Sequence, residues 1–207
     1  TFGGSTLLAS DTILIEAGAT IQNNTAGGIL SAPNVGVIVA GNLISNFPFR
    51  VNPTTSLILL PSSTTTIAVS ESAPATITVA GIAALDGALQ LNIAASRWKK
   101  GTSVPLIVSG AGVVGTFASV SYNPATFNGR FEVLYGPLEV TLLTVRGGNV
   151  VLTPCSCEQA CLVNAMNAFQ ETVGEGPLCD FIEDVLNEVP EEQSCCALQQ
   201  LVGEPYT

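Results

Sequence analysis

Short apolar runs separated by Gly, Pro, Asn and Ser dominate the first 95 residues of the chain. Runs of this length are typical of strands rather than helices. Several of them are continuously apolar instead of alternating, which favours strands that are covered on both faces. The clearest strands are predicted over Thr12–Glu16, Val35–Val39, Leu57–Leu60, Thr76–Val79 and Ala88–Ile93.

A weak repeat lies on these runs, because ILIEAG, GVIVAG and TITVAG each end in Ala-Gly, at Gly18, Gly41 and Gly81. Successive matches are 23 and 40 residues apart, which fits one and two units of about 20 residues. Coils of that length stack in a β-solenoid and bury their inward-pointing aliphatic side chains. We therefore predict a mainly β chain with a parallel β-helix (solenoid) over residues 1–95. A β-sandwich is the alternative.

The pattern changes at Leu89, from where apolar and polar residues alternate as in a half-exposed strand. Six aromatic residues gather between Trp98 and Tyr135. We predict that residues 96–153 form a β cap that closes the exposed end of the solenoid, with a continuing sandwich as the alternative. Its strands are predicted over Val104–Val108, Val113–Val120, Phe131–Tyr135 and Val140–Val145, followed by a hairpin turn at Arg146–Asn149 into Val150–Thr153.

Residues 154–207 have helical periodicity, and we predict a small α-helical tail there. Leu162, Met166, Phe169 and Val173 share one face of a helix predicted over Glu158–Val173. A second apolar stripe runs from Leu178 to Val189. Pro190 can start a third helix that ends before Gly203.

Every cysteine of the chain lies in this tail, and an even, dense set predicts structural disulfides formed in an oxidising compartment. Six cysteines allow 15 complete pairings, among which the sequence does not choose. A zinc site is the competing interpretation. The chain has no His and no CxxC pair, which argues against such a site. The six are Cys155, Cys157, Cys161, Cys179, Cys195 and Cys196.

Charge separates the same two parts of the chain. Residues 1–154 hold six acidic and six basic residues, whereas residues 155–207 hold ten carboxylates and no Lys or Arg, which accounts for the net charge of −10. Nucleic-acid binding needs clustered cations and is therefore not expected. No run of about 20 apolar residues predicts a membrane span, and the absence of a leader before Thr1 suggests a mature product or a fragment.

Residues for catalysis are sparse. Without histidine, Ser-His-Asp and Cys-His mechanisms are not available to this chain. Glu71 and Asp86 are the nearest approach to a carboxylate pair, and an enzyme acting on polysaccharide is the third functional hypothesis. Asn23-Asn24-Thr25 is a glycosylation sequon. We predict no catalytic residues, no cofactor and no metal, and hence a protein that is not an enzyme.

The segment ALQQLVGEPY at residues 197–206 resembles the A-L-x-Q-L-S-G-E-x-Y linker between passenger and translocator barrel in bacterial autotransporters. ALDGALQLNI, GTSVPLIVSGAGVVGTFASVSYNPA and YGPLEVTLLTV resemble the last passenger strands of that family. The resemblance covers about residues 80–207. This chain departs from it at Val202, where the family has Ser, at Pro205, and in its six cysteines.

This resemblance implies a right-handed β-helix passenger exposed on the outer membrane or secreted, with an autochaperone-like cap and a tail that leads to a translocator barrel in a longer chain. The leading hypothesis is a non-enzymatic structural and adhesin-type passenger segment. The alternative is a structural subunit of an extracellular filament, sheath or virion surface that is cross-linked through the tail cysteines. Its partners would be itself or neighbouring surface proteins.

Overall fold

The protein is described by a computed structural model that divides into two compact units, each considered by itself. The first unit comprises Thr1–Ala94, Ser103–Thr126 and Glu132–Leu143, and the second comprises Ala95–Thr102, Phe127–Phe131 and Thr144–Thr207. The structure describes residues 6–8, 11–32, 36–51, 55–70, 74–93, 98, 100–123, 130–146, 154–173, 177–184 and 193–202.

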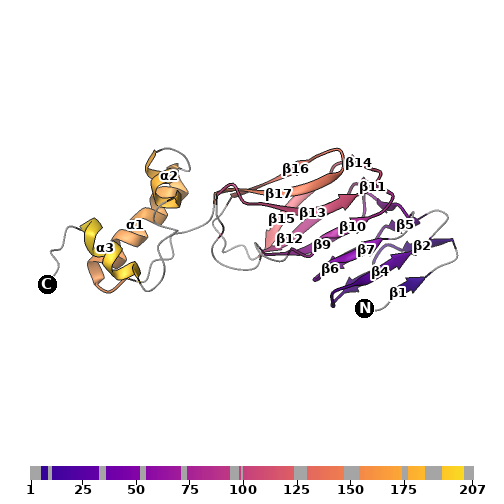
Figure 1. Cartoon of the computed structure of the whole chain (residues 1–207), viewed down its shortest axis with the longest axis horizontal. Coiled ribbons are helices and arrows are strands. Elements are labelled where there is room, and N and C mark those ends of the chain that lie inside the picture. The colour runs from indigo at the N-terminus through magenta and orange to yellow at the C-terminus, as the bar shows by residue number, and fades with distance from the viewer. Residues whose placement is uncertain are drawn as a thin grey trace. The chain divides into compact units, whose positions relative to one another are not determined.

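Short strands make up the described part of the chain as far as residue 146, and they lie in stacked layers (Figure 1). In chain order they are β1 (Thr6–Leu8), β2 (Thr12–Ile15), β3 (Thr20–Asn23), β4 (Gly28–Ser31), β5 (Gly36–Val39), β6 (Asn42–Ser45), β7 (Phe49–Val51), β8 (Leu57–Leu59), β9 (Thr64–Val69), β10 (Ile77–Val79), β11 (Ile82–Leu85), β12 (Ala88–Ile93), β13 (Ser103–Ser109), β14 (Gly112–Gly115), β15 (Ser119–Asn123), β16 (Arg130–Tyr135) and β17 (Glu139–Arg146).

These strands form three sheets, and from β1 to β15 each strand passes to the next sheet. Sheet A has the order β15-β12-β9-β6-β3, and sheet C has the order β14-β11-β8-β5-β2. Sheet B has the order β1-β4-β7-β10-β13-β17-β16. Neighbours within sheets A and C are parallel and three strands apart in the chain. The predicted parallel β-solenoid is confirmed.

Side chains that face inward stack in register from coil to coil and form the core. In sheet A, Ile21 pairs with Leu43, Leu43 with Thr65, and Thr65 with Leu89. In sheet C, the corresponding row includes Ile13, Val37, Leu57 and Ala83. Because successive strand residues point to opposite faces, every second position in most of these strands is buried.

The Ala-Gly repeat was only partly in phase with the coils. ILIEAG and GVIVAG do stack, because β2 and β5 are neighbours in sheet C. TITVAG instead ends on β10, which belongs to sheet B. Coils lengthen along the chain, since side-chain hydrogen bonds between neighbouring coils span 22 residues from Asn42 to Thr20 but 32 residues from Ser121 to Leu89. A fixed period of about 20 therefore fails beyond the first coils.

The prediction of one strand over Val113–Val120 was wrong, because this stretch turns from sheet C to sheet A. Strands β14 and β15 are separated by a bend after Gly115, which has a φ of 79°. That backbone conformation favours glycine. A Cβ atom at Gly115 would also meet the carbonyl oxygen of Leu85 in the coil beneath. The turn therefore requires glycine both for its conformation and for the close approach.

Strands β13, β14 and β15 lie in the section predicted as a cap, and they continue the parallel ladder. Each pairs with the strand three places earlier in the chain. Sheet B then changes direction, because β17 pairs antiparallel with β13 and carries β16 at the sheet edge. The predicted hairpin turn and the strand Val150–Thr153 fall mainly outside the described residues. The capping role of residues 96–153 stays a prediction.

The tail contains three described helices, which confirms its predicted helical character: α1 (Cys157–Val173), α2 (Pro177–Asp184) and α3 (Ser194–Val202). Val163, Ile182 and Leu198, one from each helix, form its buried core. Leu162, Met166 and Phe169 of the predicted apolar face pack against this core. The predicted second stripe beyond Asp184 and the start at Pro190 lie outside the described residues.

Removal of one core side chain tests the stacking of the coils. Leu43 is fully buried between Ile21 and Thr65. We expect Leu43→Ala to lower the free energy of unfolding by about 3 kcal/mol, because it leaves a cavity in a close-packed row. Urea unfolding followed by far-ultraviolet circular dichroism measures the change.

Leu14→Ala is the matched control, because Leu14 lies on the outer face of sheet C and is 56% exposed. Its expected cost is below about 1 kcal/mol. Equal losses in the two variants would contradict the assignment of inward and outward faces.

Candidate functional site

Of the two carboxylates that come nearest to a catalytic pair in the sequence, only Asp86 lies within the described residues. Asp86 lies in the turn between β11 and β12, where its Oδ1 accepts a hydrogen bond of 2.7 Å from the amide of Gly87. Glu71 lies outside the described residues. Within the described ranges, no three His, Cys, Asp or Glu side chains are grouped so that they could hold a metal ion.

The outer face of sheet A is covered by amide and hydroxyl side chains, and we call it the amide–hydroxyl face. It is built by β3, β6, β9, β12 and β15, whose outward positions alternate with buried ones in all but the last strand. None of its described positions carries a charge. Three of them, Ile44, Ala68 and Ala88, are apolar and lie between the polar residues. The polar members are Thr20, Gln22, Asn42, Thr64, Thr66, Gln90, Asn92, Ser119, Ser121 and Asn123.

Register between the coils arranges these side chains in straight rows. One row runs from Thr20 through Asn42, Thr64 and Ala88 to Ser119. Within it, the Asn42 amide donates a 3.2 Å hydrogen bond to the Thr20 hydroxyl. Because neighbouring strands are about 4.8 Å apart, the face presents donors and acceptors at a regular spacing. Such a face can form many hydrogen bonds with a neutral, hydroxyl-rich polymer.

The outer face of sheet C differs, because one of its rows is aliphatic throughout. Leu14, Ile38, Ile58, Ala84 and Val114 are paired in register from β2 to β14. Leu14 and Val114 at the two ends are 56% and 59% exposed. The alternation of burial along the strands therefore places two chemically different surfaces on one body.

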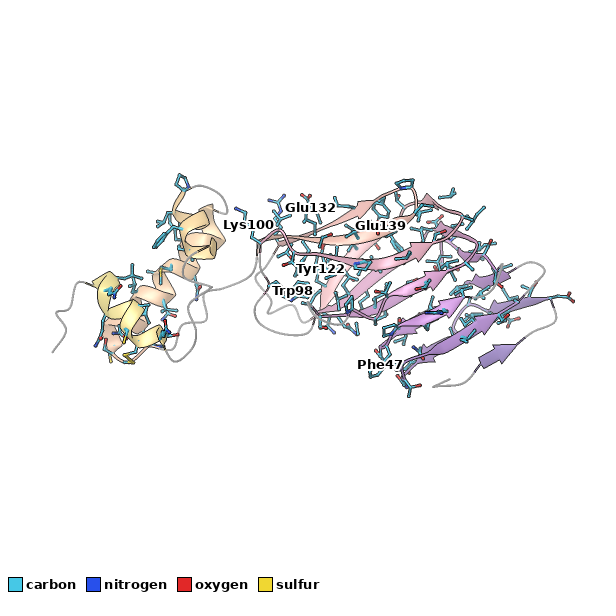
Figure 2. The ribbon with its side chains drawn as sticks, in the orientation of Figure 1. Phe47, Trp98, Lys100, Tyr122, Glu132 and Glu139 are labelled. Atoms are coloured by element: carbon cyan, nitrogen blue, oxygen red, sulfur yellow. A yellow bond between two sulfur atoms is a disulfide. The ribbon has the colours of Figure 1, made fainter. Side chains whose placement is uncertain are left out.

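Tyr122 of β15 and Glu132 of β16 lie near the last coil of the solenoid (Figure 2). The Tyr135 hydroxyl accepts a 3.3 Å hydrogen bond from the amide of Phe117. Burial raises the pKa of Tyr122 above its usual value, and the nearby charge of Glu132 and the neighbouring Tyr135 raise it further. Burial also raises the pKa of Tyr135, whereas the hydrogen bond from the amide of Phe117 lowers it by a smaller amount. Both phenols therefore stay neutral to a higher pH than usual.

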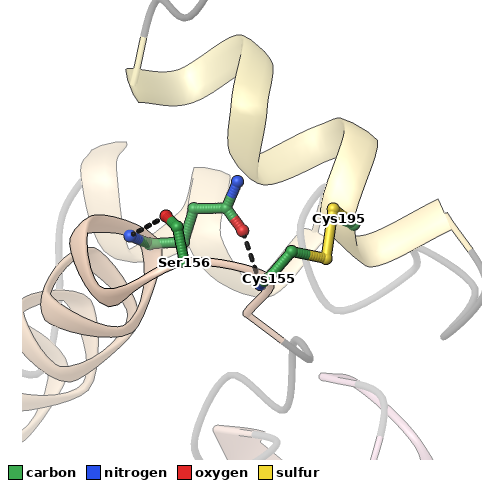
Figure 3. Close-up of a disulfide and its surroundings, with 4 residues drawn as sticks. Cys155, Ser156 and Cys195 are labelled. Carbon is green, nitrogen blue, oxygen red and sulfur yellow. Dashed lines mark hydrogen bonds between the residues drawn. A yellow bond between two sulfur atoms is a disulfide. The ribbon is translucent and has the colours of Figure 1, made fainter.

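In the tail, a disulfide between Cys155 and Cys195 joins the start of α1 to α3 across a sequence separation of 40 residues (Figure 3). Two hydrogen bonds fix the residues around it at the helix start. The Ser156 hydroxyl accepts from the amide of Gln159 at 3.2 Å, and the Gln159 side chain accepts from the amide of Cys155 at 2.7 Å. The S-x-x-Q spacing in the sequence is the signal that predicts this helix start, and it was missed.

Three other cysteines of the tail, Cys157, Cys161 and Cys196, are exposed free thiols. The described residues therefore contain one of the bridges that the even number of cysteines predicts. Bridges through the other predicted residues stay predictions. The side chain of Cys179, in α2, lies outside the described residues.

Comparisons with protein-family models, with curated proteins and with solved structures find no match to this chain. The resemblance to autotransporter passengers accordingly stays a prediction. Among the described helices, none combines the length and apolar character that crossing a membrane requires.

Loss of the disulfide is expected to loosen the tail. Cys195→Ser opens a bridge between residues 40 positions apart, and the chain-entropy argument puts the destabilisation at about 4 kcal/mol. Amide hydrogen exchange should show faster exchange in α1 and α3, because the tail core is small. Strand β12 should exchange as before. Cys161→Ser is the matched control, since this thiol is exposed and unbridged, and an equal effect in the control would contradict the role of the bridge.

We expect the free energy of unfolding to fall at alkaline pH because of Tyr122. Because the folded chain raises the pKa of Tyr122, the folded state keeps the phenol proton longer than the unfolded state does. Stability should therefore fall as the pH rises above the ordinary tyrosine value of about 10.

Glu132→Gln should lower the pKa of Tyr122 but leave it above the usual value, because burial is the larger cause. Near-ultraviolet titration of tyrosinate in a Tyr135→Phe/Tyr206→Phe background measures the change, because Tyr122 is then the one tyrosine left in the chain. Glu139→Gln removes the same charge at a position that does not contribute to the shift. If both substitutions move the titration equally, the assignment to Glu132 is wrong.

Proposed function

We propose that this chain is a non-enzymatic, secreted surface segment of structural and adhesin type. In this proposal the solenoid displays the amide–hydroxyl face to the surroundings. Residues 96–153 assist folding and secretion, as the resemblance to autotransporter passengers implies. The tail connects the solenoid to a neighbouring component of the surface.

The observation that carries the proposal is the uncharged, regular amide–hydroxyl face on a solenoid. Rows held in register by backbone pairing lose little conformational freedom when they bind, which favours affinity. Amides and hydroxyls offer both donors and acceptors, which suits polymers rich in hydroxyl groups. Because the face has no charge at its described positions, its binding should depend little on salt.

The disulfide in the tail supports the extracellular setting. Disulfides form and persist mainly in oxidising compartments, and they add most to small units that cannot bury a large core. The tail is such a unit, with three residues in its buried cluster. The setting therefore agrees with a secreted, surface-exposed chain.

A second candidate function, a structural subunit cross-linked through its tail, is favoured by one specific observation. Cys157, Cys161 and Cys196 are exposed and free, so they are accessible to thiols or disulfides of other molecules. The two candidates agree on a non-enzymatic extracellular role. They differ in whether the chain works by displaying a face or by joining neighbours covalently.

Binding to immobilised neutral polysaccharides tests the leading proposal. We expect the purified chain to bind at least one of cellulose, chitin or dextran with little change in 0.5 M NaCl. Thr66→Lys places a charge in the centre of the amide–hydroxyl face and should weaken binding about tenfold, because the lysine disrupts the row and must be desolvated.

Thr78→Lys is the matched control, because Thr78 is an exposed outward residue of β10 in sheet B. Its binding should equal that of the unmodified chain. Absence of binding to all three polymers, or an equal loss in the two variants, would overturn the proposed role of this face.

A further inference from the structure

Two exposed thiols share one face of α1. Cys157 and Cys161 are four residues apart in this helix, and both are exposed and free. Side chains four residues apart lie one above the other on a helix. A disulfide already anchors the start of the same helix to α3.

These two thiols are poorly placed to bridge each other. Neighbouring Cβ atoms at this spacing on a helix are about 5–6 Å apart, whereas the Cβ atoms of a disulfide are about 3.5–4.5 Å apart. Closure would require α1 to distort. The pair therefore differs from a redox pair that opens and closes, because one thiol cannot readily resolve a mixed disulfide on the other.

The negative charge of the tail favours a positively charged partner for these two thiols. Residues 155–207 contain ten carboxylates and no Lys or Arg, with Glu158 between the two thiols in the sequence. A second copy of the chain could be cross-linked only through its own tail, because residues 1–154 contain no cysteine. Two such tails repel each other, whereas a cationic partner is attracted.

We propose that Cys157 and Cys161 are two attachment points for disulfide exchange with a cationic partner protein that carries a reactive disulfide. The thiolate sulfur of either cysteine attacks one sulfur of the partner's disulfide. A new bond between tail and partner forms, the partner's bond breaks, and the departing thiolate takes a proton from water. The inference goes beyond the proposed display function and depends only on the tail.

Small disulfides of different charge test the proposal on the full chain with its Cys155–Cys195 bridge intact. The probes are cystamine, which is cationic, 2-hydroxyethyl disulfide, which is neutral, and dithiodipropionate, which is anionic. Mass spectrometry after proteolysis measures the rate of adduct formation at each cysteine. At low ionic strength we expect cystamine to react about tenfold faster than the anionic probe at both positions, with the difference nearly lost in 1 M NaCl.

Two charge variants locate the origin of the preference. Glu158→Gln removes the carboxylate that follows Cys157 in the sequence and should reduce the ratio of cationic to anionic rates. Glu16→Gln removes the same charge from an exposed position after β2 and should leave the ratio unchanged. An equal effect of the two variants would overturn the assignment to the tail.

Product analysis separates attachment from the other outcomes. We expect separate adducts on Cys157 and Cys161, and disulfide-linked dimers of identical chains that form more slowly at low salt than at high salt. An internal Cys157–Cys161 bridge, or dimers that form fastest at low salt, would overturn the proposal. So would equal rates for the three probes. These results leave polysaccharide binding by the amide–hydroxyl face untouched, so failure of either proposal can be distinguished from failure of the other.

Discussion

Parallel, in-register stacking of short strands is the constraint on which the solenoid depends. A strand of three or four residues buries little by itself, and its apolar side chains are covered only when the neighbouring coils place similar side chains above and below them. The row through Leu43 and Leu89 shows this dependence. Some polar residues of the interior are hydrogen-bonded to the next coil, as Ser45 is to the carbonyl of Ala75 at 3.0 Å. The hydroxyl of Thr65, in the row of Leu43, is instead buried without a hydrogen-bond partner, which costs stability.

The same stacking decides what the outside of the molecule presents. A strand contributes every second residue to the surface, and register repeats that contribution from one coil to the next. The outer face of sheet A in this way becomes polar and has no charge at its described positions, and the outer face of sheet C carries an aliphatic row from Leu14 to Val114. The faces belong to the assembled ladder rather than to any one strand. This explains how a chain with few titratable groups in its body can still have distinct surfaces.

The tail is stabilised in a different way. Its core consists of Val163, Ile182 and Leu198 with three partly buried neighbours, which is small for three helices. A covalent bridge and the capping hydrogen bonds of Ser156 and Gln159 supplement that core. All of the chain's excess acidic charge also lies in this unit. The solenoid and the tail are therefore each stabilised by different interactions. They also offer different chemical groups to partners.

Local periodicity let the sequence predict the element types. The alternation of polar and apolar residues predicted the bounds of β12, Ala88–Ile93. The helical spacing of Leu162, Met166 and Phe169 predicted the face of α1 that packs against the tail core. Other strands, such as β3 and β6, were missed because their polar outward residues interrupt the apolar runs. The same polar residues form the amide–hydroxyl face, so the candidate site was missed for the same reason. Its clue was the alternation of polar Thr64 and Thr66 with buried neighbours.

The sequence by itself determined the strand-rich body, the helical tail and the separation of charge and cysteine between them, because these follow from composition and from local periodicity. The choice of a solenoid over a sandwich rested on a repeat that only partly follows the coils. Only the tertiary structure decided which strands are neighbours, since the coils differ in length and a fixed period cannot give their register. It also decided that Cys155 joins Cys195, a contact 40 residues apart in sequence. Both depend on how distant segments pack, and no local pattern encodes that distance.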